Sequence, residues 1–243
     1  MARRVIESIT SVGIIYRATN PAEIFLEAKD DGLPVKLFRR GLCPIGGNWI
    51  GGSDRGPLNT FRRELEEELT LDALSVSWLR GSFSLMPGRR VPVGDSARAL
   101  LTEVKRVIKQ DAVPFGDCLN VTPKAVLDRA DPDNQEDGFA TLTTYWAIPI
   151  GNTLWATLVG LQAEFGNLSN ESITLITSLD EILDNKIRFA YAHDRAYQRF
   201  FLAMGLARAR QMTLIEGIEH ELVGTSLPTY DDYLERFDVA RRP

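Results

Sequence analysis

The stretch Arg63-Glu64-Leu65-Glu66-Glu67-Glu68 decides the fold, and it follows the glycine-rich segment Cys43-Pro44-Ile45-Gly46-Gly47-Asn48-Trp49. If residues 58–69 are helical, Glu64, Glu67 and Glu68 lie at i, i+3 and i+4 and share one face. Like charges at that spacing repel, so the cluster favours a compensating cation. Three oxygen donors on a rigid helix predict a seat for Mg²⁺ or Mn²⁺, which prefer carboxylate ligands.

A run of glutamates is also typical of a solvated helix face, because glutamate is a strong helix former. The surrounding sequence argues for more than that. Gly56-Pro57 is typical of a helix start, and an apolar stripe occupies another face, formed by Leu58, Phe61, Leu65 and Leu69. The sequence therefore predicts a helix that is anchored on one side and charged on the other.

This segment resembles the box of the Nudix hydrolases. That box is a glycine, five residues, a glutamate, seven residues, then Arg-Glu-apolar-any-Glu-Glu-any-Gly-apolar. Its second half is matched by Arg63, Glu64, Leu65, Glu67, Glu68 and Leu71. The first half departs, because Arg55 stands at the glutamate position and the loop after Gly46-Gly47 is longer.

Two departures carry structural consequences. The family's upstream glutamate orients the arginine, so one hypothesis is that Asp54, next to Arg55, does this after a shift in the loop. Thr70 stands where the family has its second glycine. Either Thr70 adopts a costly left-handed conformation or the helix ends differently.

The resemblance implies an α/β fold, the Nudix-like α/β/α sandwich around a mixed β-sheet. Periodicity alone indicates only α plus β. We expect a Nudix-like domain over residues 1–210, with an insertion over about 88–137 after the box helix. Residues 211–243 are expected to be a C-terminal helical tail.

The resemblance also implies a Nudix-type pyrophosphohydrolase that uses Mg²⁺ or Mn²⁺ to hydrolyse a phosphoanhydride in a nucleoside diphosphate derivative. Glu64 and Glu68 are then the core ligands with Glu67 beside them, and Arg63 orients the carboxylates. A further acid comes from a later loop in many relatives, as a metal ligand or general base. Glu164 is the candidate, a surface glutamate is the alternative, and Glu171 and Glu136 are rivals.

Other residues near the box are candidates for substrate contact. Gly46 and Gly47 form the loop, and Trp49 is expected either to stack on a base or to pack against the core. Basic side chains are candidates for phosphate contact or ordinary solvated groups. They are Lys36, Arg39 and Arg40 before the loop, and Arg89, Arg90, Arg98, Lys105 and Arg106 in the insertion.

Composition narrows the class of protein. With 44% hydrophobic and 25% charged residues, the 243-residue chain is typical of a soluble globular protein. Its net charge of −5 argues against stable nucleic-acid binding but allows a nucleotide-derived small molecule. Arg3 and Arg4 precede no apolar segment, so no secretory signal is expected, and Cys43 and Cys118 are expected to be reduced thiols of a cytoplasmic protein.

The pattern of residues also predicts further elements. Strands are expected at Ser11–Arg17, Glu23–Ala28, Lys36–Arg39, Leu42–Ile45, Ser75–Leu85, Leu142–Ile150, Thr153–Leu161 and Ser172–Ile176. Helices are expected at Ala97–Gln110, Pro123–Arg129, Ile187–Ala209, Leu214–Leu222 and Tyr230–Phe237, with a capping box from Ser178 to Glu181. The uncharged run from Phe139 to Ala163 is interrupted by Pro149 and Gly151, so two strands explain it better than a membrane span.

His193 and His220 are the histidines of the chain, and His193 is expected to be exposed or in a helix contact rather than catalytic. A competing hypothesis is a non-enzymatic module that kept the fold but lost turnover. Arg55 and Thr70 motivate that hypothesis. The family often forms homodimers, so a homodimer is also a candidate assembly.

Overall fold

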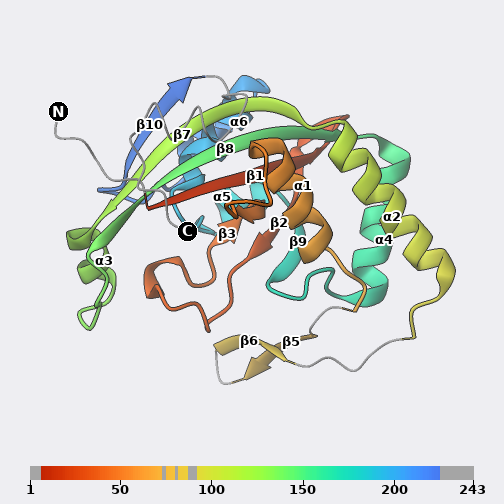
Figure 1. The fold of residues 1–243 in the computed structure, drawn as a ribbon, viewed down its shortest axis with the longest axis horizontal. Helices are drawn as coiled ribbons and strands as arrows, with labels where there is room; N and C mark the ends of the chain where they lie inside the picture. The colour runs from red at the N-terminus through yellow and green to blue at the C-terminus, as the bar shows by residue number, and fades with distance from the viewer. Residues whose placement is uncertain (1–6, 73–74, 80–81, 87–91, 225–243) are drawn as a thin grey trace.

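The computed structural model describes residues 7–72, 75–79, 82–86 and 92–224, with backbone alone for 75–79 and 82–86 (Figure 1). The strands are β1 Ser8–Arg17, β2 Asn20–Ala28, β3 Leu42–Cys43, β4 Ile45–Asn48, β5 Ser75–Leu79, β6 Ser82–Met86, β7 Val113–Pro123, β8 Gly138–Ile150, β9 Ile173–Ser178 and β10 Glu219–Gly224. The helices are α1 Pro57–Glu68, α2 Asp95–Gln110, α3 Lys124–Ala130, α4 Asn152–Phe165, α5 Leu179–Asp184 and α6 His193–Ala203, with 3₁₀ turns η1 Lys36–Phe38 and η2 Ala207–Gln211.

Strand β1 organises the main sheet, which has eight strands in the described residues and the principal order β10-β7-β8-β1-β2-β3. On one side β1 pairs in parallel with β8 along its whole length. On its other side the partner changes, because Thr10–Gly13 pair with β4 and Ile15–Arg17 pair with β2. The sheet therefore forks beside β1, and β4 carries the glycine loop away on one branch.

Helices cover both faces of this mixed sheet (Figure 1). On one face α1, α2 and α4 contribute Phe61, Leu65, Val104 and Leu158 to a core that also includes Ile15 of β1. On the other face α5 and α6 close a second core, which includes Leu179, Ile182, Phe200 and Phe201. The predicted α/β fold, an α/β/α sandwich around a mixed sheet, is confirmed.

Several local predictions are confirmed as well. Pro57 is the first residue of α1 and Gly56 caps it, as the sequence indicates. Strands β1 and β2 form the expected antiparallel pair. Ser178 and Glu181 make both hydrogen bonds of a capping box. Cys43 and Cys118 are free thiols, both buried.

The segment after β8 was predicted as a strand, and this is wrong. Residues 153–161 belong to helix α4, because Trp155, Leu158 and Leu161 recur every three residues and are buried together. Gly166 ends that helix in a left-handed conformation. The β-branched and apolar residues of this uncharged run masked the helical spacing.

Three further predictions need correction. The helix expected over 187–209 is only His193–Ala203, because Leu42 hydrogen-bonds to the backbone of Arg188 and Ala190 and holds that segment extended. No helix forms at Leu214–Leu222, where one was expected, and residues 219–224 instead form β10 on the edge of the sheet. The expected strand over 36–39 is the 3₁₀ turn η1.

The region expected as an insertion, about 88–137, supplies helices α2 and α3 at the predicted places. It also supplies β7, which the sequence did not predict and which lies between β8 and β10 in the main sheet. The strand expected over 75–85 is the hairpin β5–β6. The helix expected at Tyr230–Phe237 lies outside the described residues. Within the described ranges, every helix is too short or too polar to cross a membrane.

Gly13 of β1 permits the close approach of α1 to the sheet. A Cβ atom at Gly13 would lie 2.6 Å from Cε2 of Phe61 and 2.8 Å from Cδ1 of Ile148. Such distances force buried side chains apart, so Gly13→Ala is expected to lower the free energy of unfolding by about 1–3 kcal/mol. Thermal or urea unfolding measures it.

Gly160 provides the matched control. It lies within α4, where a Cβ atom would meet nothing within 4 Å. Gly160→Ala is therefore expected to raise the free energy of unfolding by about 0.4–1 kcal/mol, because the unfolded chain loses freedom. Equal effects of the two substitutions would contradict the packing of α1 on β1.

Candidate functional site

Helix α1 lies with one side in the core and one side along a cavity. Phe61 and Leu65 are fully buried in the core beneath the helix. Glu64, Glu67 and Glu68 all line a cavity of about 710 Å³. The predicted i, i+3, i+4 face therefore exists. It is graded in exposure, since Glu68 is 4% exposed whereas the side chain of Glu67 is 54% exposed.

The backbone of the β4 glycine loop holds one of these carboxylates by a hydrogen bond and lies close to a second. The backbone N–H of Gly46 donates a hydrogen bond to Oε2 of Glu68 at 3.0 Å. Gly46 has a φ of +133°, and a Cβ atom there would lie 2.3 Å from the carbonyl oxygen of Ser11. A Cβ atom on Gly47 would lie 2.5 Å from Oε2 of Glu64. Both glycines are needed, because any side chain would displace a neighbouring strand or a carboxylate.

The Arg63 side chain hydrogen-bonds to several groups of the segment between β4 and α1. Its guanidinium donates to both carboxylate oxygens of Asp54, at 3.0 and 2.9 Å, and to the carbonyl of Asn48 at 2.7 Å. Asp54 also accepts from the backbone N–H of Ile50 and from the hydroxyl of Thr60. Asp54 therefore orients the arginine, as the hypothesis from the sequence proposed.

Two features of the structure explain how the chain accommodates Arg55 and Thr70, which depart from the sequence pattern. Arg55 is exposed to solvent and leaves the buttressing role to Asp54. Helix α1 ends on Leu69 in an extended conformation, and the backbone N–H of Thr70 donates to the carbonyl of Leu168. Thr70 thus needs no left-handed conformation, and the helix ends differently from one terminated by glycine.

Arg63 also contacts two glutamates of α1. Its Nη1 atom lies 2.8 Å from Oε1 of Glu64 and 2.9 Å from Oε2 of Glu67. Burial raises the pKa of Glu64, and the charges of Glu67 and Glu171 raise it further, against the lowering effect of Arg63. The negative charges of this cluster are therefore close enough to disfavour one another.

A buried ionic layer lies beneath the exposed glutamates. Glu27 of β2 is 0% exposed, and neither of its carboxylate oxygens accepts a hydrogen bond among the described residues. Its nearest cation is Lys29, with Nζ 3.5 Å from Oε2. Burial raises the pKa of Glu68 well above its ordinary value, and the Glu27 charge adds to this while Lys29 opposes it. Two carboxyl groups, those of Glu27 and Glu68, thus share this layer with one ammonium group, that of Lys29.

These residues fit a hard divalent cation. Their donors are carboxylate oxygens, which Mg²⁺ and Mn²⁺ prefer, and Glu27 has unused acceptor capacity. Within the described ranges no three acidic, histidine or cysteine side chains already converge closely enough to hold an ion. Arg63 accounts for part of this, because it occupies oxygens of Glu64 and Glu67.

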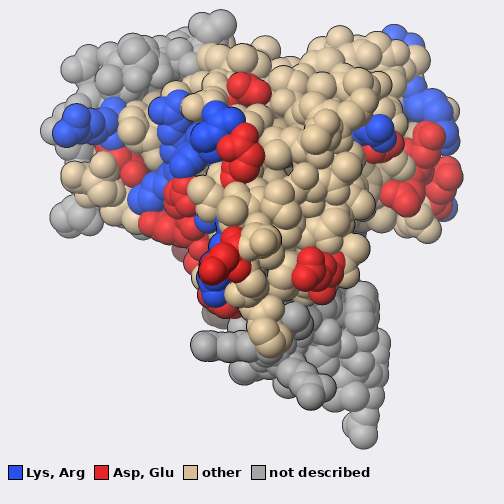
Figure 2. Space-filling view, turned by 90° about the vertical axis from the view of Figure 1, so that its right-hand side faces the viewer, with Lys and Arg blue, Asp and Glu red and all other residues tan. Residues whose placement is uncertain are grey.

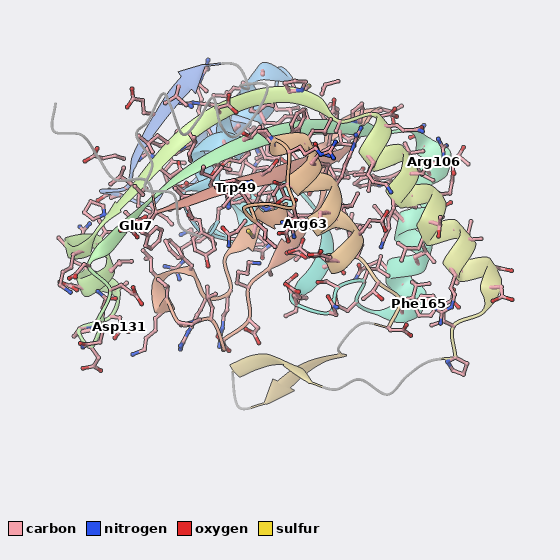
Figure 3. All side chains as sticks on the ribbon, viewed as in Figure 1. Glu7, Trp49, Arg63, Arg106, Asp131 and Phe165 are labelled. Carbon is pink, nitrogen blue, oxygen red and sulfur yellow. The ribbon has the colours of Figure 1, made fainter. Side chains whose placement is uncertain are left out.

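Glu164 does not join the glutamates of α1. It is exposed in the last turn of α4, and it is absent from the residues that line the cavity. Phe165, which directly follows it, lies well away from Arg63 in Figure 3. The expectation assumed that a strand precedes Glu164, whereas a helix carries it outwards. Glu171, from the loop between α4 and β9, lines the cavity instead.

Other predicted contacts lie outside the cavity lining. The indole N–H of Trp49 donates to the carbonyl of Asp54 at 3.2 Å, so Trp49 braces the loop. Arg39 donates to the carbonyl of Leu33 at 2.7 Å. Glu136 lies in the loop after α3, where Lys124 donates to its carbonyl.

The basic side chains of α2 also lie away from the cavity. Lys105 pairs with Glu66 at 3.1 Å, and Arg106 pairs with Glu103 on the same helix. Figure 2 shows this side of the molecule, where basic and acidic side chains lie next to one another. Arg89 and Arg90 lie outside the described residues. The candidate phosphate contacts of α2 are thus engaged in surface ion pairs.

Sequence reasoning missed several residues of the cavity. They are Lys29, Asn120, Thr141, Thr143, Tyr191 and His193, all of which line it. One usable signal was Glu27, a charged residue that directly follows the apolar run Ile24–Leu26 in β2. His193 was expected to be exposed or in a helix contact, but it is 5% exposed and its Nδ1 lies 2.7 Å from the Tyr145 hydroxyl.

Comparisons with known proteins give distant similarities. No family model matches the chain. A curated imidazolonepropionase of Shewanella denitrificans is 28% identical over 163 residues, which are 63% of this chain and 38% of that protein. The chain therefore spans well under half the length of that relative. A solved mutT/nudix family protein from Listeria innocua aligns with 83% of this chain and 96% of its own, at 14% identity and a TM-score of 0.43.

The bond between Asp54 and Arg63 yields a stability prediction. Asp54→Ala removes the two charge-assisted hydrogen bonds between Arg63 and Asp54. We therefore expect a loss of about 1.5–3 kcal/mol in the free energy of unfolding. Asp72→Ala is the control, because Asp72 and Arg98 form an exposed pair at 3.7 Å. That variant is expected to change stability by less than about 0.5 kcal/mol. Urea unfolding compares them, and indistinguishable losses would refute the assigned role.

The two histidines predict a pH dependence of stability. Burial lowers the pKa of His193 to about 3 and that of His220 to about 4, with Lys29 and Arg199 respectively adding to it. Between about pH 6.5 and 4 the unfolded chain therefore binds more protons than the folded one. We expect each histidine to reduce the free energy of unfolding by on the order of 1 kcal/mol per pH unit as pH falls through that range.

The measurement needs a difference, because Glu64, Glu68 and Asp194 have raised pKa values and contribute the opposite slope. The free energy of unfolding of the unmodified chain minus that of His193→Gln should shrink between pH 7.5 and 5. A difference that stays constant over this range would show that His193 is not held neutral.

Proposed function

We propose that the chain is a divalent-metal-dependent hydrolase that cleaves a phosphoanhydride in a nucleoside diphosphate derivative. One observation carries the proposal. The carboxylates of α1 are seated against glycine backbone along the wall of a 710 Å³ cavity, large enough for a nucleotide-sized ligand. The resemblance of residues 63–71 to the Nudix box agrees with this chemistry.

The roles of the residues follow from their positions. Glu64, Glu67 and Glu68 would hold the ion, with Glu68 fixed by its hydrogen bond from Gly46. A divalent ion held there would neutralise the charge of a diphosphate and activate a water molecule. Arg63 is a positioning residue, because it is tied to Asp54 and contacts Glu64 directly.

Glu171 is proposed as the acid from the later loop, in place of Glu164. It lines the cavity, and its charge is felt by Glu64. In this role its carboxylate accepts a proton from the attacking water. The water oxygen then bonds to phosphorus while the bridging P–O bond breaks, and a nucleoside monophosphate and a second phosphate-bearing product leave.

Hydrolysis is tested with Mg²⁺ or Mn²⁺ and a panel of dinucleotides and nucleotide sugars, with product release measured by chromatography. Glu64→Gln and Glu68→Gln are expected to lower kcat by about 100-fold or more, because each removes a carboxylate that would hold the cation at the reacting phosphate. Glu171→Gln should also lower kcat.

Two glutamates serve as controls. Glu66 lies on the same helix but pairs with Lys105 and Lys109 on α2, and Glu164 is exposed on α4. Glu66→Gln and Glu164→Gln should leave kcat within about threefold, as expected for surface groups away from the chemistry. A full loss of activity in either control, or none in Glu68→Gln, would overturn the assignment.

A second candidate is a nucleotide-binding or regulatory module with little turnover. The contact of Arg63 with both Glu64 and Glu67 favours it, since the arginine competes with a cation for those oxygens. Calorimetry separates the two functions. Nucleotide binding without release of any product would support the module, whereas metal-dependent turnover would exclude it.

A further inference from the structure

A second part of the cavity wall presents neutral polar side chains. Thr10 of β1, Asn120 of β7 and Thr143 of β8 lie on it, together with His193 at the start of α6. Asn120 and Thr143 are almost fully buried, at 4% and 1% exposure. Buried polar groups in such a wall cost free energy unless hydrogen bonds satisfy them. Which group donates and which accepts in those hydrogen bonds therefore decides whether the wall presents donors or acceptors to a ligand.

Arg199 sets that direction at one end of a chain of hydrogen bonds. Its Nη1 lies 3.0 Å from Nε2 of His220, and Nδ1 of His220 contacts Oδ1 of Asn120. A guanidinium can only donate, so Nε2 of His220 must accept. The neutral ring then carries its proton on Nδ1, which donates to Asn120. The low pKa of His220 agrees with a neutral ring.

Asn120 continues this chain of hydrogen bonds to the cavity wall. Because its Oδ1 accepts from His220, its amide nitrogen is free to donate, and Nδ2 lies 3.4 Å from Oγ1 of Thr143. Thr143 also accepts from the hydroxyl of Thr10 at 2.8 Å. With both partners donating to it, Thr143 retains its own proton. No acceptor among the described residues receives that proton, so it is available to a ligand in the cavity.

A second branch runs through Tyr145. The Asn120 side chain also hydrogen-bonds to the Tyr145 hydroxyl. Because Oδ1 of Asn120 accepts from His220, its amide nitrogen donates this bond as well. Tyr145 is left to donate its own proton to Nδ1 of His193, 2.7 Å away. Because Nδ1 accepts from Tyr145, the neutral ring of His193 carries its proton on Nε2. This branch therefore also ends in a donor, on a residue that lines the cavity.

The backbone before α6 is strained, and this conformation fixes two side chains on the cavity wall. Tyr191 and Ala192 have φ values of 50° and 63°, in the left-handed region that non-glycine residues rarely adopt. The hydrogen bond from Ala190 to Leu42 at 2.8 Å and that from His193 to Ala190 at 2.9 Å hold them there. Strain of this kind persists where the fold fixes side chains for function. Here it places Tyr191 and His193 on the cavity wall.

An aromatic surface adjoins the two donors. Phe139 and Tyr191 both line the cavity, with ring centroids 6.4 Å apart. Aromatic faces of this kind bind flat rings through stacking and apolar contact. The same part of the cavity therefore combines a surface for a planar ring with donors for its edge.

We propose that this donor wall, polarised by Arg199 through His220 and Asn120, selects a planar heterocycle with a carbonyl acceptor over one with an amino group at the same position. The proposal rests on the proposed function, because it assigns the base of the nucleoside diphosphate derivative to this part of the cavity. A carbonyl accepts the protons of Thr143 and His193, whereas an amino group would place donor against donor.

Binding of matched nucleotides tests the selection without any need for turnover. Inosine and adenosine 5′-monophosphates differ at the 6-position, and uridine and cytidine 5′-monophosphates differ at the 4-position, each pair exchanging a carbonyl for an amino group. Calorimetry in Mg²⁺ buffer should show the carbonyl member of at least one pair binding about tenfold or more tightly, as one buried hydrogen bond provides.

Asn120→Asp tests the direction of the chain itself. A carboxylate only accepts, so Thr143 and Tyr145 would turn their protons towards it. Nδ1 of His193 would then donate to Tyr145, and Nε2 would become an acceptor at the cavity. The preference should therefore reverse towards the amino-bearing nucleotide. A simple loss of affinity for all four nucleotides would not fit this account.

Arg199→Met leaves Asn120 unchanged but removes the guanidinium group, which can only donate. It is therefore the alternative test if Asn120→Asp fails to fold. The ratio of affinities within the discriminating pair should fall to about onefold to threefold, since one hydrogen bond no longer fixes the direction. Arg208→Met is the control, because Arg208 is exposed and pairs with Asp180 and Asp184 rather than with the chain. It should leave the ratio unchanged.

The outcomes separate this inference from the proposed hydrolase function. Equal affinities within both pairs, a preference retained in Arg199→Met, or no nucleotide binding would each overturn the donor wall. Hydrolysis without base preference would support the hydrolase function and overturn the donor wall. Base preference without hydrolysis would support the donor wall and count against the hydrolase function.

Discussion

The burial of the Glu68 carboxylate against the backbone of Gly46 is the constraint on which the site depends. A carboxylate that is 4% exposed needs a donor, and the N–H of Gly46 at 3.0 Å supplies it. That donor is available at Gly46, where β4 pairs with β1 and the backbone has a φ of +133°. The position of α1 against the sheet, the fork of the sheet and the cavity are thus consequences of one arrangement.

The loop between β4 and α1 shows how a contact can form when a sequence pattern is shifted by one residue. Read by position, Arg55 replaces an acid with a base. In three dimensions the neighbouring Asp54 takes the acid's place and binds Arg63 through both of its oxygens. A longer loop allows the one-residue shift, because surface loops accommodate insertions at small cost. Spacing in a motif therefore matters less than the hydrogen bonds that it provides.

The cavity joins an acidic part and a polar, aromatic part. Its acidic part comes mainly from α1, and the loop before β9 adds Glu171. Its polar and aromatic part is assembled from β7, β8 and the segment before α6, which is held extended by its backbone bonds to Leu42. Arg199 and His220, outside the cavity lining, set the hydrogen-bond direction within it. Such a division allows substrate selection to vary while the carboxylates stay fixed.

The sequence by itself determined the features that depend on neighbouring residues. They are helix α1 with its proline start and glutamate face, the glycine loop, the β1–β2 pair, the capping box and the α/β class. Only the tertiary structure decided that residues 153–161 are helical, that Glu171 rather than Glu164 lines the cavity, and that His193 is buried beside Tyr145. The physical reason is that these outcomes depend on packing between residues far apart in the chain, which local propensity and spacing do not encode.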